Sequence, residues 1–512
     1  MVISGKMTTF AAIIFTIILK NVTTPMKKNH LIMSTLLFCG LGMFTACSDV
    51  KDNPATNPTT EPVTSAERKV FEEQFSKDMQ AMADGFRFEA AMKTTTSLKE
   101  FIDVLDENAL ATQVTSILGQ MIGGLSATTL DTFDEKEKAH VISLLKSRFG
   151  ITDDDMKDMQ GIMIVDAYNS IGKMKLEFKD GQCNITNDAD AFTIVSTNSN
   201  GETKTVALKF NDERDGVRFF VTRLASIPIC VQLPQSIGVT MTTADGEIVN
   251  GTVNLTTIDE NQSKFISFKE SGWLADVKLT ANVNNRQESM TVYAKHTEQR
   301  AFDLKAAFEI QGKEMARVEF TDMHDQYTDE EIDSEEFKSM REMGPFFAGA
   351  YDLLKALKGK SVDNVAITIN DNLVVNGKVD DIAKSLLALG NVRKLHGSQP
   401  GKETIDQYTQ QLNGLVHFTF SQKNTGITAQ GTLVTAQKEL QDGEYQPAVA
   451  LQFSDETEPL VLLDRMTATD MANYKTMMGS FQPLVTEMSE LLISARKKGE
   501  AVLSSVKSTF GM

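Results

Sequence analysis

The sequence predicts an α+β fold in which antiparallel β-meander sheets pack against amphipathic helices. Three observations support this class. Apolar residues recur at helical spacing near both ends, apolar and polar residues alternate with period two from about residue 173 onward, and tight-turn dipeptides separate the alternating segments. Each strand then has one apolar and one polar face, so helices are expected to cover the apolar faces of the sheets.

Two helices are predicted at the start of the folded region. Thr64 and Glu67 form a capping box, and apolar residues follow at steps of three and four over residues 71–86. Ser97 and Glu100 repeat the capping signature, which predicts that a second helix begins at Ser97. A methionine- and phenylalanine-rich stripe at this spacing is typical of a helix face that packs into a core.

A third helix is predicted over residues 134–149, and the first long meander follows it. The strands of this meander are expected at residues 174–178, 206–210, 275–283, 290–294, 302–310 and 316–320. The tight turns are expected at Asp180-Gly181, Asn200-Gly201, Asp215-Gly216, Asp245-Gly246 and Asn250-Gly251.

The second half of the chain repeats the alternation of helix and sheet. An acidic run at residues 329–336 opens a predicted helix, because acids in a first turn favour the helix dipole. This helix is expected to continue to about residue 357 with a kink at Gly344-Pro345. Later helices are expected at residues 382–389, 404–412 and 467–510, strands at 365–369, 373–375, 415–420, 427–435 and 448–453, and turns at Asn376-Gly377 and Asp442-Gly443. This order predicts two sheet-plus-helix units, residues 64–328 and 329–512.

The N-terminal region reads as a signal for secretion. Met26-Lys27-Lys28 precedes a short apolar run over residues 31–44, and Thr45-Ala46-Cys47 follows. This stretch resembles the signal peptide and lipobox of bacterial lipoproteins, with Phe44 where that family prefers leucine. The resemblance implies that cleavage makes Cys47 the first mature residue, that a diacylglycerol is attached to its sulfur, and that a fatty acid such as palmitate acylates its amino group.

Two other interpretations of this region were weighed. The apolar run of roughly 14 residues is too short for the ~20 that span a bilayer, and an ordinary signal peptide needs no cysteine at the cleavage site. Residues 1–25 hold a second apolar run, so we expect translation to start at Met26 and residues 1–46 to be removed.

Residues 47–63 are expected to form the lipidated N-terminus and a flexible tether, because three prolines and many polar residues cannot build a core. Asp49 and Asp52 partly match the surface-export signal of Bacteroidota lipoproteins. The resemblance therefore implies an outer-membrane lipid anchor, with the body on either the cell surface or the periplasmic face.

Charge and cysteine content restrict the partners. The formal net charge is −18, and loss of four lysines with residues 1–46 makes it about −22, so nucleic acid and anionic membrane surfaces are poor partners. Beyond Cys47, the mature chain keeps Cys183 and Cys230, which either form a disulfide in an oxidising compartment or remain two buried free thiols.

Chemistry-bearing motifs are sparse. The histidines do not form a known catalytic or zinc motif, and Asp322, His324 and Asp325 are better explained as a solvated loop before a helix than as a metal site. Trp273, the one tryptophan, falls on the apolar face of its strand, which counts against a glycan-binding platform. We therefore predict no catalytic residue, cofactor or metal.

The sequence thus predicts a lipid-anchored cell-envelope lipoprotein with a non-enzymatic binding or interaction role. Its partner could be a protein or a small apolar ligand, and the oligomeric state stays open. An alternative is a carrier that holds a lipid in a cavity between sheet and helices, for which an apolar cavity of several hundred Å³ would be the evidence. A further alternative is a hydrolase whose site is assembled from distant residues.

Overall fold

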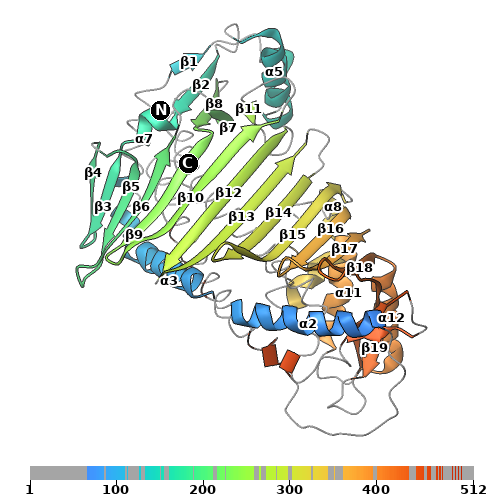
Figure 1. Ribbon diagram of the computed structural model, residues 1–512. Helices are drawn as coiled ribbons and strands as arrows, with labels where there is room; N and C mark the ends of the chain where they lie inside the picture. The colour runs from blue at the N-terminus through green and yellow to red at the C-terminus, as the bar shows by residue number, and fades with distance from the viewer. Residues whose placement is uncertain are drawn as a thin grey trace. The chain divides into compact units, whose positions relative to one another are not determined.

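The structure is a computed structural model in which antiparallel strands dominate and helices pack beside them (Figure 1), so the α+β class is confirmed. It describes residues 66–85, 88–109, 112–113, 126–128, 133–149, 151–154, 161–187, 189–211, 216–224, 227–258, 265–266, 272–283, 285–297, 302–324, 327–343, 347, 351, 361–395, 400–437, 445–454, 458–462, 469–470, 472–473, 476, 487, 491, 494 and 498.

The chain divides into two compact units that each combine distant segments. Unit 1 comprises the described residues within Phe88–Arg300 and Leu484–Met512, and unit 2 those within Lys28–Arg87 and Ala301–Pro483. The folding-domain boundary expected between residues 328 and 329 stays a prediction.

The large sheet of unit 1 follows the strand order β4-β3-β5-β6-β9-β10-β12-β13. Neighbouring strands are antiparallel except β3 and β5, which run parallel. The strands are β3 (Lys175–Lys179), β4 (Gln182–Thr186), β5 (Phe192–Thr197), β6 (Thr203–Phe210), β9 (Ser236–Thr243), β10 (Gly246–Thr257), β12 (Trp273–Val283) and β13 (Arg286–His296).

One side of this sheet packs on helix α3 (Glu89–Val104), as the alternation predicted. Phe101 and Ile102 of α3 share a buried cluster with apolar residues of five strands of this sheet, among them Leu176, Phe210 and Met241. Burial of such side chains contributes about 1.5–3 kcal/mol each, so this cluster holds helix and sheet together.

Helix α3 begins eight residues before the predicted start at Ser97, which is instead buried within the helix. Phe88 at the N-cap makes no side-chain capping bond. Glu288 of β13 replaces it, because its Oε2 accepts a hydrogen bond of 2.8 Å from the Ala91 N–H. A carboxylate there satisfies a free N–H group and the helix dipole, so the cap comes from tertiary structure rather than from a local motif.

Unit 1 also contains a smaller sheet that the sequence did not predict. Two of its strand pairs are parallel, whereas only antiparallel meanders were expected. Its order is β1-β2-β8-β7-β11. The predicted helix at residues 134–149 is confirmed as α5 (Glu135–Phe149), and its Val141 and Leu145 pack with Cys230 and Phe265 of the sheet. The elements are β1 (Ser126–Thr128), β2 (Ile162–Asp166), β7 (Val217–Leu224), β8 (Ile227–Leu233), β11 (Phe265–Ile266) and the short helix α7 (Ala167–Ile171).

Unit 2 contains an antiparallel meander whose strands are neighbours in chain order, from β14 to β21. The strands are β14 (Phe302–Ile310), β15 (Lys313–His324), β16 (Ser361–Ile369), β17 (Leu373–Val379), β18 (Val416–Gln422), β19 (Thr428–Gln437), β20 (Tyr445–Gln452) and β21 (Leu460–Val461). Its main helices are α2 (Ala66–Gly85), α11 (Ile382–Lys394) and α12 (Lys402–Asn413), each at a predicted position.

The helix predicted after the acidic run is broken before the kink expected at Gly344-Pro345, which lies outside the described residues. Its described part consists of α8 (Asp329–Ile332), α9 (Glu335–Lys338), the 3-10 turn η2 (Ser339–Met343) and the helical residues Phe347 and Tyr351. The break lies at Ser334, whose backbone is extended. Most of the predicted helical segment at 467–510, the capping residue Thr64 and the turn at Asp442-Gly443 lie outside the described residues.

Three predicted turns are confirmed, and two Asn-Gly turns are wrong. Asp180-Gly181, Asn200-Gly201 and Asp245-Gly246 do connect neighbouring strands. Gly251 instead lies within β10 and Gly377 within β17. A Cβ would lie 2.2 Å from the Lys278 carbonyl oxygen at Gly251 and 2.5 Å from the His417 carbonyl oxygen at Gly377, so both glycines permit close strand contact.

The buried carboxylate of Asp78 joins helix α2 to the β16–β17 turn of the same unit. Asp78 is 1% exposed, and its Oδ1 accepts hydrogen bonds from Asn370 Nδ2 at 3.0 Å and Gln74 Nε2 at 3.2 Å. Its Oδ2 accepts one of 2.6 Å from Asn372 Nδ2, and the Asn372 Oδ1 in turn accepts from the Asn424 N–H. Asn370 begins the turn between β16 and β17 with a left-handed φ of 53°, so this turn positions the amides that surround Asp78.

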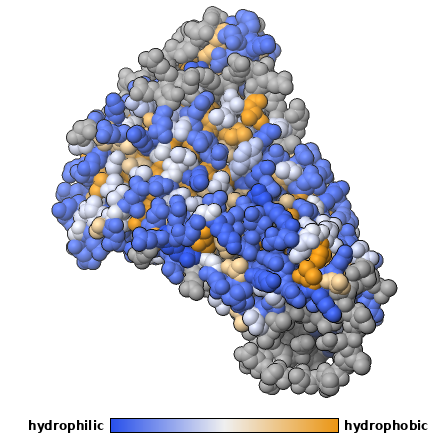
Figure 2. All heavy atoms as spheres, in the orientation of Figure 1, coloured by the Kyte–Doolittle hydropathy of each residue, from blue (hydrophilic) through white to orange (hydrophobic). Residues whose placement is uncertain are grey.

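Hydrophilic residues cover most of the described surface seen in Figure 2, with hydrophobic ones scattered among them. None of the helices in the described part of the chain has the length and apolar character needed to cross a membrane.

Candidate binding surface

The predicted lipidation site, Cys47, lies outside the described residues. Cys183 of β4 and Cys230 of β8 are both free thiols in the structure. Burial raises the pKa of the Cys183 thiol to about 11, so it stays protonated and unreactive at neutral pH. Cys230 is fully buried against α5.

The residues weighed as a metal site do not converge. Asp322 adopts a φ of 56° and its N–H donates to Asp303 Oδ1 at 3.0 Å. His324 Nε2 lies 3.6 Å from Asp363 Oδ2, and both side chains are about half exposed. Asp325 is outside the described residues, within which no three His, Cys, Asp or Glu side chains are grouped so that they could hold a metal ion.

The described histidines have separate surroundings. His140 Nε2 lies 3.4 Å from the Phe265 carbonyl oxygen. His296 is buried and stacks on Trp273 with ring centroids 5.8 Å apart, and Trp273 packs partly buried against the unit 1 core. His417 is exposed, with its Nε2 3.3 Å from Asp380 Oδ2.

The side of the unit 1 sheet opposite α3 is strongly polar. Lys204 of β6 is ion-paired with Glu100 of α3, and Glu288 of β13 caps α3, so these positions face the helix. Side chains alternate along a strand, so the residues next to them face the opposite side. We call this surface the threonine face; its members are Thr203, Thr205, Ala207, Lys209, Ser236, Gly238, Thr240, Thr242, Glu247, Asn250, Thr252, Asn254, Thr256, Leu274, Asp276, Lys278, Thr280, Asn282, Gln287, Ser289, Thr291, Tyr293 and Lys295.

Cross-strand register aligns the members of the threonine face in rows. In one row Thr240, Asn250, Thr280 and Ser289 are successive partners. The Thr280 and Ser289 hydroxyls are 3.1 Å apart and buried, so they satisfy each other. Neighbouring strands lie about 4.8 Å apart, so each row presents polar groups at a regular interval across the sheet.

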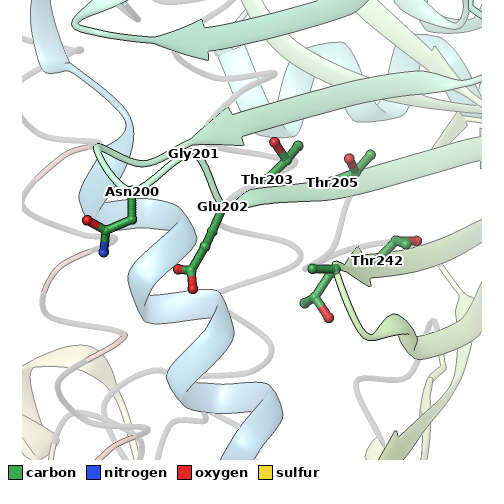
Figure 3. A pocket seen from close by; sticks show the side chains of 8 residues that line it. Asn200, Gly201, Glu202, Thr203, Thr205 and Thr242 are labelled. Atoms are coloured by element: carbon green, nitrogen blue, oxygen red, sulfur yellow. The ribbon is translucent and has the colours of Figure 1, made fainter.

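A polar hollow lies at the ends of the β5–β6 and β9–β10 hairpins (Figure 3). Its volume is about 460 Å³, within the range of small-molecule sites. Its lining consists of Asn200, Gly201, Glu202, Thr203, Thr205, Thr242, Thr243 and Ala244. Most lining residues are threonine, asparagine or glutamate, so hydroxyl, amide and carboxylate groups stand beside the threonine methyl groups and can bind a polar ligand.

Hydrogen bonds within the β5–β6 turn hold the side chains that line one side of the hollow. Asn198 Oδ1 accepts hydrogen bonds of 3.0 Å from both the Asn200 and the Glu202 N–H groups. Asn198 Nδ2 then donates to Glu202 Oε2 at 2.7 Å, which orients the carboxylate. Glu202 is the titratable group in the lining, and hydroxyls and amides bind without proton transfer, so the arrangement favours recognition over acid–base catalysis.

Reasoning from the sequence identified no residue of the threonine face as functional. The available signal was the alternation of threonine and asparagine with apolar residues over residues 238–256. No strand was predicted there, since Asn250-Gly251 matched a turn, and the register that aligns the rows is set by pairing between distant strands. No protein-family model matches this sequence, and neither curated proteins nor solved structures provide a match.

Proposed function

We propose that this protein is a lipid-anchored lipoprotein of the cell envelope with a non-enzymatic binding role, and that its ligand lies on the threonine face. The observation that carries the binding role is the set of hydroxyl and amide groups on the threonine face, exposed at Thr203, Thr242, Asn250 and Thr252, beside a hollow of about 460 Å³. The anchor rests on the signal peptide, the lipobox and Cys47.

The tether proposed for residues 48–63 would let the body reach a ligand away from the membrane. We also propose that the two compact units act as two sheet-plus-helix domains, with the ligand surface on unit 1. An outer-membrane location, on the cell surface or the periplasmic face, belongs to the same proposal.

The polar lining bears on the alternative of a lipid carrier. An apolar ligand gains little from threonine hydroxyls and a carboxylate, since these groups must lose hydrogen bonds to water without replacement. The hollow therefore supports a polar ligand better than a lipid.

The anchor is tested by labelling cells that express the full-length chain with an alkyne analogue of palmitate. Cys47→Ser should abolish labelling and release the protein from the membrane fraction, whereas Cys183→Ser should leave both unchanged. Equal labelling of the wild type and Cys47→Ser would refute the anchor.

The binding role is tested with the full-length protein in detergent on an array of polar small molecules and polymers. We expect a hit that Thr205→Val with Thr242→Val weakens and that Thr428→Val, in unit 2, leaves unchanged. Turnover on a broad hydrolase panel would contradict a non-enzymatic role.

A further inference from the structure

The charges of the threonine face differ from those of the chain as a whole. The chain has 69 acidic against 51 Lys and Arg residues. On the threonine face the cations Lys209, Lys278 and Lys295 outnumber the acids Glu247 and Asp276. Acidic side chains, which keep an acidic protein soluble, are thus scarce on this surface.

Two of these lysines stand in one cross-strand row. The row runs from Lys209 through Gly238 and Thr252 to Lys278, each the register partner of the next. Three strand spacings separate the two lysines, roughly 14 Å between backbones. Lysine side chains are long and flexible, so both ammonium groups can turn toward the space above Gly238 and Thr252.

That space is polar and has room for a small group. A Cβ at Gly238 would make ordinary van der Waals contacts with Lys209 Cβ at 3.6 Å and Asn211 Nδ2 at 3.7 Å, without a clash. The exposed Thr252 hydroxyl lies on one side and the Asn211 amide on the other. Both groups can donate hydrogen bonds to an anionic oxygen.

Both lysines are exposed, and neither is within ion-pair distance of a carboxylate among the described residues. Asp276 is on the same face two residues from Lys278, yet the two form no ion pair there, and Glu247 accepts a hydrogen bond from Asn250. Other strand lysines of this chain are paired: Lys305 with Glu319 at 3.2 Å and Lys378 with Asp380 at 2.8 Å in unit 2, and Lys175 with Glu177 in unit 1. The chain thus pairs several of its strand lysines with acids, whereas Lys209 and Lys278 have no such partner among the residues that the structure describes.

We propose that the threonine face binds a polyhydroxylated polymer that carries carboxylate or sulfate groups, with one anionic group held between Lys209 and Lys278. The ammonium groups complement the anion, and the rows of threonine and asparagine exchange hydrogen bonds with the hydroxyls. The inference deepens the proposed function and rests on it.

The shape and chemistry of the face favour this class over others. A polymer lying across the strands meets a new polar side chain about every 4.8 Å. Nucleic acid carries too dense a charge for so few lysines on so acidic a chain. Aromatic stacking is not required, since Trp273 packs toward the core while hydroxyl groups and lysines make the contacts.

The test uses the full-length lipidated protein in detergent and three polymers. Polygalacturonate offers hydroxyls and carboxylates, dextran offers hydroxyls alone, and polyglutamate offers carboxylates alone. We expect polygalacturonate to bind best, with affinity that falls as NaCl rises from about 50 to about 500 mM because salt screens exposed charges.

The double variant Lys209→Gln with Lys278→Gln should weaken polygalacturonate binding about tenfold, since it removes two charge-assisted contacts. The matched control, Lys402→Gln with Lys423→Gln in unit 2, removes the same charge and should change binding less than twofold. Thr240→Val, which keeps shape and charge, should weaken binding severalfold and so reports on the hydroxyl rows.

Three results would overturn the inference: no binding of polygalacturonate, equal binding of polyglutamate, or equal loss in the two double variants. These failures are distinct from failure of the proposed function. A protein that is labelled by palmitate and inactive on the hydrolase panel, yet binds none of the polymers, keeps the proposed function and loses this inference.

Discussion

Replacing Asp78 by asparagine tests how α2 is fastened to unit 2. The Asp78 carboxylate is 1% exposed and accepts hydrogen bonds from the side-chain amides of Gln74, Asn370 and Asn372. Asparagine has the same shape but offers one acceptor oxygen and one NH₂ group. In either orientation, an NH₂ group therefore faces an amide donor that had an acceptor before.

The expected cost follows from that mismatch. A buried donor left without an acceptor costs about 1–3 kcal/mol, and more when the lost acceptor was charged, so Asp78→Asn should lower the free energy of unfolding of unit 2 by about 2–3 kcal/mol. Asp84→Asn is the matched control on the same helix. Asp84 is exposed and bonded to Gln80, so its change should stay within about 0.5 kcal/mol.

The assay is urea unfolding of the full-length chain followed by two probes. Far-ultraviolet circular dichroism reports on both units, whereas the fluorescence of Trp273, the one tryptophan, reports on unit 1. We expect Asp78→Asn to shift the circular-dichroism transition while the Trp273 transition stays in place. If Asp78→Asn shifts unfolding no more than Asp84→Asn does, the reasoning about the buried carboxylate is refuted.

Three further predictions concern backbone packing, pH and thiols. Gly251→Ala should cost about 1–3 kcal/mol by overpacking against the Lys278 carbonyl, whereas Gly238→Ala, with ordinary contacts only, should not destabilise the protein; equal melting temperatures would contradict this. Burial raises the pKa of Glu314 above its ordinary value, so the folded state holds that proton more tightly and stability falls as pH rises past the unfolded pKa. Glu314→Gln should therefore melt like the wild type near about pH 4 and above it near about pH 7, and a difference that shrinks with pH would reverse the sign. Cys183 and Cys230 should resist iodoacetamide in the native protein at neutral pH and react once it is unfolded without reductant, as mass spectrometry can check; unreactive thiols in the unfolded chain would reveal a disulfide.

The sequence was a good guide to the large sheets and to the helices with strong apolar stripes. Period-two alternation predicted the strands of residues 275–320, because one face of each must be buried and a one-residue slip would expose it. The helices at residues 382–389 and 404–412 were predicted for the same reason at a different period. Burial of one face is a local property of sequence, so it can be read locally.

Errors arose where a residue serves a distant partner. Ser97 and Glu100 match a capping box, yet α3 starts earlier because Glu288, 197 residues away, accepts the Ala91 N–H. Gly251 and Gly377 follow asparagines and were predicted to form turns, yet both lie within strands, where the missing side chain allows close contact with the neighbouring strand. A local motif cannot show whether its residues are used locally, so these positions required the pairing of the strands.

The candidate site was beyond sequence reasoning for a related reason. Lys209 and Lys278 are 69 residues apart and become members of one row only through the registers of β6 with β9, β9 with β10 and β10 with β12. The polar hollow likewise combines two hairpin ends, residues 200–205 and 242–244. Each threonine on its own indicates only a strand with a wet face.

Strand propensity explains part of the threonine face but not its charges. Threonine favours strands because its branched side chain fits a pleated surface, so a threonine-rich wet face needs no ligand. If this face served only to keep the acidic chain soluble, it would be expected to carry acidic side chains. If it served only to stabilise the strands, its lysines would be expected to pair with acids on neighbouring strands, as Lys305 does with Glu319 in unit 2. Among the described residues Lys209 and Lys278 have no acidic partner, and Gly238, which has no side chain, lies between them in the row. The threonine-to-valine and lysine-to-glutamine variants separate these explanations, because a purely structural face would lose stability with no change in polymer binding.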